Sequence, residues 1–299
     1  MKRLNGIVCA NITPMNSDGS IDYAAMQHLT QYLIKSGVHG LFSNGSNGEG
    51  ILLSLQERMR LAELIVNEDN GKIPVIIQCG AQNVNDTVAL ASHAAAVGAD
   101  GIGVMTPYFF RQNDEALYHY YLAAAHAVPD TPVYIYNIPS HTNNDLQPVL
   151  VSRLHCESPN IVGIKYSHAD LLRLDEYLHI DDSFDAFIGC DRLLLPALSQ
   201  GAAGGVSGPV AVFPELFVSL WQSWQRQDLV RARLYQKKII AAEKGLAAYS
   251  SIPMIKTYLC AIGLFGSNFC RSPFQALSSD ESRQLLVQIE ELKQIIEQE

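Results

Sequence analysis

Lys165 is the residue whose type and position most directly predict chemistry. It closes the apolar run 161–164, which is typical of a buried strand, whereas most of the other lysines are expected near the termini or on polar helical faces. A lysine side chain at such a place is partly withdrawn from water, which disfavours its charged form. A neutral amine can attack a ketone carbonyl and form a Schiff base. The alternative is a strand-end lysine that extends its ammonium group to solvent.

Tyr136 ends the apolar run that precedes the one closed by Lys165. Adjacent parallel strands lie about 4.8 Å apart, so residues at equivalent height on two such strands can meet. A tyrosine beside an amine–carbonyl site can move protons while the carbinolamine forms and breaks down. The alternative is a buried aromatic residue whose hydroxyl is satisfied by a neighbouring group.

The segment Gly45-Ser46-Asn47-Gly48-Glu49 offers a way to hold a carboxylate without a cation. Its glycines follow the order GxxGxG, not GxGxxG, so it does not predict a dinucleotide site. Backbone N–H groups near a helix N-terminus, together with the Ser46 hydroxyl and the Asn47 amide, can cradle a carboxylate. The alternative is a tight turn between a strand and a helix.

The elements that must position these residues alternate along the chain. Short β-branched runs predict strands, and amphipathic stretches between them predict helices; successive strands begin roughly 20 to 35 residues apart, the length of one βα unit. Eight units favour a (β/α)8 TIM barrel, an α/β fold, over a doubly wound open sheet. The predicted strands are Gly6–Asn11, Gly40–Ser43, Val75–Cys79, Gly101–Met105, Val133–Tyr136, Val162–Lys165, Ala186–Gly189 and Gly204–Ser207. The predicted barrel helices are Tyr23–Ser36, Leu55–Asn67, Asn85–Val97, Asp114–Ala127, Leu146–Leu154, Leu171–Leu178 and Leu193–Gln200.

The strand pattern stops near residue 212. We therefore predict a barrel over residues 1–212 and a C-terminal helical extension over 213–299 that packs on it. No Pro- or Ser-rich linker separates the two parts, so one structural unit is expected. The helices predicted for the extension are Pro214–Arg226, Asp228–Tyr249, Pro253–Leu264 and Ser279–Gln298.

The active site of such a barrel lies at the C-terminal ends of its strands. The residues that follow each predicted strand are therefore the candidates for substrate contact. His141 follows the fifth strand, where it can reach substrate or be an ordinary loop histidine, Gly189 and Asp191 end the seventh, and Ser207 ends the eighth.

Composition excludes several classes of function. The net charge of −9 and the absence of a basic patch argue against nucleic-acid binding. No apolar run reaches about 18 residues, so no membrane span is expected. The six scattered cysteines form no CxxC pair, and the N-terminus has no signal-peptide pattern, which together predict reduced thiols in a cytoplasmic protein. An anionic substrate would need local cations or backbone amides.

Metal and cofactor sites are not predicted. Glu115, His119 and His126 fall on one outer helix and are expected to be surface positions. Neither HxH nor HExxH occurs, which disfavours a zinc-dependent aldolase. No cofactor is needed for lysine Schiff-base chemistry.

Three motifs together resemble the dihydrodipicolinate synthase / N-acetylneuraminate lyase family of class I pyruvate-dependent aldolases. They are the segment 45–49, Tyr136-Asn137-Ile138-Pro139 and Gly163-Ile164-Lys165, in family order and spacing, and the likeness extends over nearly the whole chain. The resemblance implies a (β/α)8 barrel with C-terminal helices, usually a homotetramer. It also implies that Lys165 forms a Schiff base with pyruvate or another 2-oxo acid and that Tyr136 transfers protons. Ser46 and Asn47 would hold the substrate carboxylate.

Departures from the family pattern narrow the expected substrate. His141 stands where dihydrodipicolinate synthases carry an arginine for the second carboxylate, and Ser46-Asn47 replaces their usual pair of threonines. In many members a tyrosine at the position of Phe109 reaches the active site of a neighbouring subunit. A phenylalanine has no hydroxyl, so this position does not predict a proton relay between subunits.

Gly189 and Asp191 resemble the members that cleave sugar acids, where groups at these positions meet substrate hydroxyls. Arg192 replaces the acidic neighbour expected in sialic-acid lyases. The Ser-Asn turn is similar to that of hydroxy-oxoglutarate and 2-keto-3-deoxy-sugar-acid aldolases.

We therefore expect a lyase that cleaves a 2-keto-3-deoxy sugar acid, or a similar 4-hydroxy-2-oxo acid, into pyruvate and an aldehyde. Dihydrodipicolinate synthase or N-acetylneuraminate lyase activity is the alternative within the same chemistry. A barrel that binds 2-oxo acids without catalysis is the alternative of another class.

Overall fold

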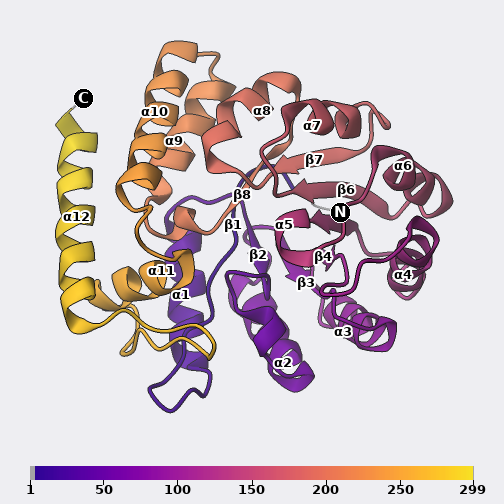
Figure 1. Cartoon of the computed structure of the whole chain (residues 1–299), viewed down its shortest axis with the longest axis horizontal. Coiled ribbons are helices and arrows are strands. Elements are labelled where there is room, and N and C mark those ends of the chain that lie inside the picture. Colours follow the sequence, from indigo (N-terminus) through magenta and orange to yellow (C-terminus); the bar gives the residue numbers. More distant parts are fainter. Residues whose placement is uncertain (1–3, 299) are drawn as a thin grey trace.

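Eight parallel strands close into a barrel in the computed structural model, which describes residues 4–298 and their side chains up to 294. The barrel closes where β1 pairs with β8, with Cys9 opposite Ser207. Figure 1 shows the strands at the centre and the helices around them. This arrangement confirms the predicted (β/α)8 fold. The strands are β1 (Gly6–Cys9), β2 (Gly40–Ser43), β3 (Val75–Gln78), β4 (Gly101–Met105), β5 (Val133–Asn137), β6 (Ile161–Tyr166), β7 (Asp185–Ile188) and β8 (Gly204–Ser207).

Each strand is followed by a helix that covers the barrel. The last of these, α9, packs against β1 and the turn after β8, so the predicted boundary at residue 212 falls between β8 and its own helix. The covering helices are α1 (Tyr23–Lys35), α2 (Leu55–Asp69), α3 (Val84–Ala96), α4 (Asp114–His126), α6 (Pro148–Glu157), α7 (Leu171–Leu178), α8 (Leu194–Gln200) and α9 (Pro214–Gln225).

Three further helices lie together on one side of the barrel: α10 (Leu229–Gly245), α11 (Ser251–Ala261) and α12 (Ser279–Gln298). The outermost helix, α12, packs against α10 and α11. None of the helices in the described part of the chain is long and apolar enough to cross a bilayer. Residues 1–3, on which the signal-peptide prediction partly rests, and 299 lie outside the described residues.

Local sequence signals explain where many helices begin. Ser54 accepts a hydrogen bond from the backbone N–H of Glu57, while the Glu57 side chain accepts one from the Ser54 N–H, which is a capping box at the start of α2. Asp22, Asn83 and Asn113 cap α1, α3 and α4 in the same side-chain-to-backbone manner. These caps mark where each of the four helices begins after the loop that follows a strand.

The predicted element types are correct, but several boundaries move. β1 ends at Cys9 instead of Asn11, and β5 extends to Asn137. A short helix, α5 (Pro139–Thr142), follows β5 and was not predicted, because four residues are too few to show a helical period. The strands themselves are buried on both faces, which explains their continuous apolar runs.

The inside of the barrel has its own aromatic core. Phe42, Tyr136 and Phe187 are each at most 1% exposed and belong to one interior cluster. The Phe42 ring fits because Gly103 has no side chain: a Cβ there would lie 2.4 Å from the ring. Phe42 and Tyr136 meet edge to face, with 5.5 Å between ring centroids. This core forms the floor beneath the strand ends.

The turn after β2 is fastened to α11 by a buried ion pair. Glu49 and Lys256 are both fully buried, and their carboxylate and ammonium groups are in direct contact. Lys256 also donates to the Phe269 carbonyl at 2.9 Å, and the backbone N–H of Arg271 donates to Glu49 at 2.7 Å. Lys256 thus departs from the surface position expected of most lysines. No pattern in the sequence indicated this, because the carboxylate that compensates its charge lies 207 positions earlier in the chain.

Arg271 carries this attachment outward to α2. Its guanidinium donates to both carboxylate oxygens of Glu57 at 2.9 Å and to the carbonyls of Leu52 and Gly19. These hydrogen bonds from Arg271 lower the pKa of Glu57 to about 2.

Replacing Glu57 by Gln should make the protein's stability less dependent on acid. The folded-state pKa of Glu57 is depressed from about 4.3 in an unfolded chain, so its contribution is present above that value and is lost as the pH falls through about 2. We expect Glu57→Gln to lower the free energy of unfolding by at most about 3 kcal/mol at pH 7. Urea unfolding at pH 7, 5 and 3 measures this, with the exposed Glu291→Gln as control. A deficit of equal size at every pH would contradict the assignment.

Candidate active site

A cavity of about 260 Å³ opens at the C-terminal ends of the strands. It is lined by every residue that the sequence predicted as a site residue. These come from the segments after β2, β5 and β7 and from strands β5, β6 and β8. These residues are Ser46, Asn47, Tyr136, His141, Lys165, Gly189, Asp191 and Ser207. Their proximity is a property of the fold.

Lys165 and Tyr136 lie side by side because their strands are in register. Tyr136 on β5 is paired directly with Lys165 on β6. The Lys165 Nζ lies 3.9 Å from the centroid of the Tyr136 ring and 4.6 Å from that of Phe42. Lys165 is 4% exposed, and no side chain among residues 4–294 forms an ion pair or hydrogen bond with its amine. The amine is therefore unoccupied by an acidic partner and faces the cavity.

The turn after β2 reaches across to the tyrosine. The hydroxyls of Ser46 and Tyr136 are 2.9 Å apart and hydrogen-bonded. The turn is held in place by Thr13, whose hydroxyl donates to the Gly48 carbonyl at 2.7 Å, and by the Glu49–Lys256 pair. Ser46 can thus exchange a proton with Tyr136 and still offer its hydroxyl to a bound carboxylate.

Asn47 lies against the opposite side of the cavity, near the end of β8. A Cβ on Gly208 would come within 2.8 Å of the Asn47 amide, so glycine is needed for this approach. The Ser251 hydroxyl, at the start of α11, lies 3.5 Å from the Asn47 Oδ1. The cavity therefore includes one wall from the C-terminal helices.

Asp191 and Ser207 form a hydrogen-bonded pair on the β7–β8 side. The Ser207 hydroxyl donates to the Asp191 Oδ2 at 2.9 Å. Burial raises the pKa of Asp191 to about 7, with a further contribution from the charge of Glu243, against the opposing effects of the Ser207 hydrogen bond and the Lys165 charge. At neutral pH this carboxyl group can both accept a hydrogen bond from a substrate hydroxyl and donate one.

Gly189 lines the cavity at a position where the backbone packs too closely on Ser167 for a larger residue. A Cβ at this position would lie 2.2 Å from the Ser167 hydroxyl. The missing side chain leaves the Ser167 hydroxyl beside the cavity, which both residues line. Gly189 thus determines the shape of the cavity and gives it no functional group of its own side chain.

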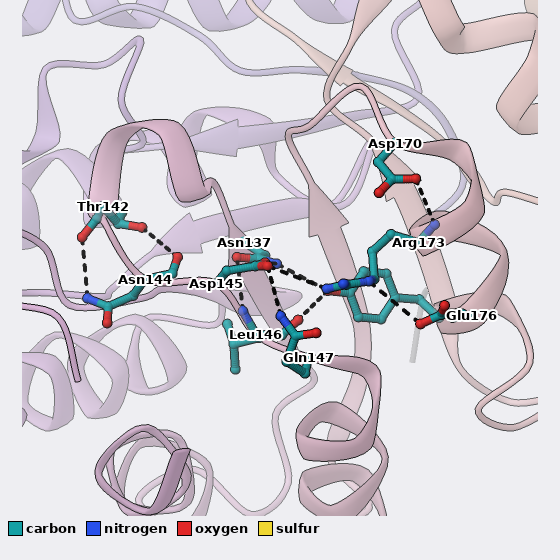
Figure 2. A network of polar contacts seen from close by, with 10 residues as sticks. Asn137, Thr142, Asn144, Asp145, Leu146, Gln147, Asp170, Arg173 and Glu176 are labelled. Carbon is teal, nitrogen blue, oxygen red and sulfur yellow. Dashed lines mark hydrogen bonds and ion pairs between the residues drawn. The ribbon is translucent and has the colours of Figure 1, made fainter. Parts of the chain in front are cut away.

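His141 sits at the rim, on the short helix α5. It is exposed, and its Nδ1 lies 2.9 Å from the Ser140 hydroxyl. The segment that carries it is anchored by the network in Figure 2: Asn137 donates to Asp145 at 2.9 Å, and Arg173 on α7 contacts the same carboxylate. Asn137, directly after Tyr136, thereby connects the end of β5 to the segment that follows the helix carrying His141.

Two arginines that could substitute for a family arginine lie outside the cavity around Lys165. Arg111 lines a separate surface cavity with Asn144 and Asp145. The Arg192 Nε donates to the Glu243 carboxylate at 2.9 Å. Neither arginine lines the cavity around Lys165. Phe109, which stands at the position of the lent tyrosine, is 75% exposed and lies outside this cavity.

The predicted surface histidines lie where expected. His119 and His126 are both exposed on α4, and the His119 ring is 4.0 Å from the Glu115 carboxylate. Among the residues that the structure describes, no three His, Cys, Asp or Glu side chains gather as a metal site.

Several residues that line the cavity were not singled out from the sequence. They are Ile138, Ser140, Ser167, Val206, Gly208, Pro209 and Ser251. All but Ser251 lie within a few residues of a predicted strand end, so the rule that sites follow strands could have found them. Ser251 has no such signal, because it belongs to the extension and reaches the cavity through tertiary packing.

The closed barrel, with the buried Lys165 near the end of its sixth strand, is a (β/α)8 fold with a polar cavity at the strand ends. Comparison with known proteins shows the class: the matching family consists of lyases and aldolases. Residues 3–292 match the model of the Dihydrodipicolinate synthetase family. The chain belongs to this family, as the motifs around Ser46, Tyr136 and Lys165 indicated.

Relatives within the family have different names. A protein named as a probable 2-dehydro-3-deoxy-D-pentonate aldolase of Escherichia coli K12 is 33% identical over 94% of each chain. The N-acetylneuraminate lyase of Mus musculus is 36% identical over 80% of this chain and 76% of its own. The crystal structure of YagE from E. coli K12, in complex with pyruvate, is 30% identical with a TM-score of 0.92, and the match covers 97% of this chain and 98% of YagE.

Removing the Ser46 hydroxyl should weaken the binding of 2-oxo acids. We expect Ser46→Ala to cost about 1.5–3 kcal/mol in pyruvate affinity, because a charged acceptor loses one donor. Asn47→Ala should behave similarly if its amide reaches the same carboxylate. Calorimetric titration with pyruvate measures both, and an unchanged affinity in the two variants would contradict the carboxylate cradle.

Proposed function

We propose that this protein is a class I aldolase that cleaves 2-keto-3-deoxy sugar acids, or similar 4-hydroxy-2-oxo acids, into pyruvate and an aldehyde. The observation that carries the proposal is the buried amine of Lys165. It has no ion-pair partner among the side chains that the structure describes, and it lies 3.9 Å from the centroid of the Tyr136 ring in a polar cavity. An amine placed this way is suited to attack a ketone.

The proposed reaction uses the groups of this cavity in sequence. The Lys165 Nζ attacks C2 of the oxo acid, and loss of water, with protons moved by Tyr136, gives the iminium ion. The C4 hydroxyl loses its proton, the C3–C4 bond breaks, and its electron pair moves into the iminium to form an enamine. The aldehyde leaves, C3 takes up a proton, and water hydrolyses the imine to pyruvate and free lysine. Ser46 and Asn47 hold the carboxylate throughout.

The distal side of the cavity favours a neutral aldehyde. The Asp191–Ser207 pair can bind a hydroxyl, and His141 at the rim offers a hydrogen bond without a permanent charge. Arg111 lines a separate cavity and Arg192 donates to Glu243, so neither of these arginines lines the cavity around Lys165 to meet a second carboxylate. This supports sugar-acid cleavage over condensation with aspartate semialdehyde.

Two other functions use the same residues. Dihydrodipicolinate synthase and N-acetylneuraminate lyase activities share Lys165 and Tyr136 and differ in the distal pocket. A barrel that binds 2-oxo acids without turnover would keep the carboxylate cradle. Neither Arg111 nor Arg192 lines the cavity, which supports sugar-acid cleavage over dihydrodipicolinate synthase activity.

We also propose that the protein forms a homotetramer in the cytoplasm. A homotetramer is usual for the family, and the exposed Phe109 and Phe110, 75% and 63% accessible in one chain, are suited to contact with another copy. Six cysteines without a disulfide suit a reducing cytoplasm.

Lys165 should form an imine with pyruvate that borohydride reduces. Lys165→Ala should abolish both this trapping and turnover and leave the thermal unfolding midpoint nearly unchanged. Intact-protein and peptide mass spectrometry locate the adduct, and the exposed Lys237→Ala serves as a matched control that keeps full trapping. An adduct on any other lysine would show that the nucleophile is misassigned.

The purified protein should release pyruvate from at least one 2-keto-3-deoxy aldonic acid and show weak or no dihydrodipicolinate synthase activity. The physical reason is that His141 replaces the cation which a second carboxylate requires. A coupled pyruvate assay over a panel of sugar acids measures the first activity, and condensation with aspartate semialdehyde measures the second. Efficient condensation without cleavage of any sugar acid would overturn the substrate assignment.

A further inference from the structure

A second cavity, of about 320 Å³, lies directly beside the catalytic one. The two share Asp191, Pro209 and Ser251 as lining residues. The second cavity extends away from Lys165, between the turn after β8 and helices α9, α10 and α11. The two cavities therefore adjoin at these three residues, next to the Asp191–Ser207 pair.

The inner wall of this second cavity is apolar. It is built from side chains of α9, α10 and α11 and of the residues next to these helices, each at most 5% exposed: Phe213, Leu216, Phe217, Ile239, Leu246 and Met254. By contrast, the catalytic cavity is lined by hydroxyls, an amide, an imidazole and an amine. A molecule that spans both would meet polar groups at one end and hydrocarbon at the other.

Its polar groups are concentrated near Asp191 and are mainly acidic. The Glu243 Oε1 accepts the hydrogen bond from Arg192, while the enclosed Oε2 has no hydrogen-bond donor within the described residues. Two carboxyl groups at this point repel an anionic tail, and each can accept a hydrogen bond from a hydroxyl. The junction between the two cavities, at Asp191 and Glu243, thus favours a substrate tail without charge.

We propose that this second cavity is the subsite for the aldehyde-derived end of the substrate. It would take 4-hydroxy-2-oxo acids whose tail is uncharged and ends in an apolar aliphatic or aromatic group. The proposal rests on the aldolase function and names a further substrate class for it. With the carboxylate at Ser46 and Asn47 and C2 on Lys165, the C4 substituent points toward Asp191 and continues into the apolar space.

The size of the cavity sets the length of tail that it can hold. About 320 Å³ corresponds to roughly ten water molecules in the liquid, which leaves room for about six carbon atoms or a phenyl ring. Each methylene buried there should raise kcat/KM about fourfold until the cavity is filled.

The test is condensation of pyruvate with aldehydes of increasing length, from acetaldehyde through butanal and hexanal, with glyceraldehyde as the polar reference. We expect kcat/KM to rise about fourfold for each added methylene in the unaltered protein. Ala247→Trp should remove this gain, because Ala247 lines the cavity and an indole ring there would occupy its space. Ala242→Leu, which fills the interior from α10, should shorten the longest aldehyde accepted.

Ala248→Trp is the matched control, since this exposed neighbour does not line the cavity. It should keep the full dependence on chain length, and all three variants should keep borohydride trapping with pyruvate. A flat or falling series in the unaltered protein, with trapping intact, would overturn the subsite and leave the aldolase proposal standing. Absence of trapping in the unaltered protein would instead overturn the aldolase function itself.

Discussion

The buried contact between Glu49 and Lys256 is the interaction on which the geometry of the cavity most depends. It joins the turn that carries Ser46 and Asn47 to a helix that comes after the last strand of the barrel. Removing one partner from a fully buried pair typically costs about 3–5 kcal/mol, because a charge is left without compensation. The pair therefore fixes the turn against α11 while the barrel strands fix Lys165 and Tyr136. The carboxylate cradle and the nucleophile keep their separation through two independent supports.

The cavity changes in character from one side to the other. Around Lys165 the barrel supplies aromatic faces, hydroxyls and an amine without a carboxylate partner. Toward β7 and β8 it supplies a carboxyl group whose raised pKa, about 7, reflects its burial. Beyond Asp191 the walls come from the C-terminal helices and become apolar. Reaction chemistry and substrate selection are thus built from different parts of the chain.

Local patterns in the sequence were enough to predict the fold and the residues around Lys165. Strand ends of a parallel barrel share one rim, so Tyr136, Lys165, Asp191 and Ser207 could be brought together without coordinates. The ion pair of Lys256 and the position of Ser251 could not be predicted, because both result from packing between segments about 200 residues apart. The four-residue helix that carries His141 was missed because it is shorter than the helical period needed to recognise it.

The contribution of α10 and α11 to the cavity has a consequence for how such a protein can diversify. Residues 242–249 line part of the second cavity but belong neither to a barrel strand nor to the loops that follow the strands carrying Lys165 and Tyr136. Substitutions in this short stretch can therefore accumulate without disturbing the bond-breaking apparatus. Changes confined to this stretch, whether natural or made in the laboratory, would therefore alter the aldehyde specificity and leave the residues that break the bond in place.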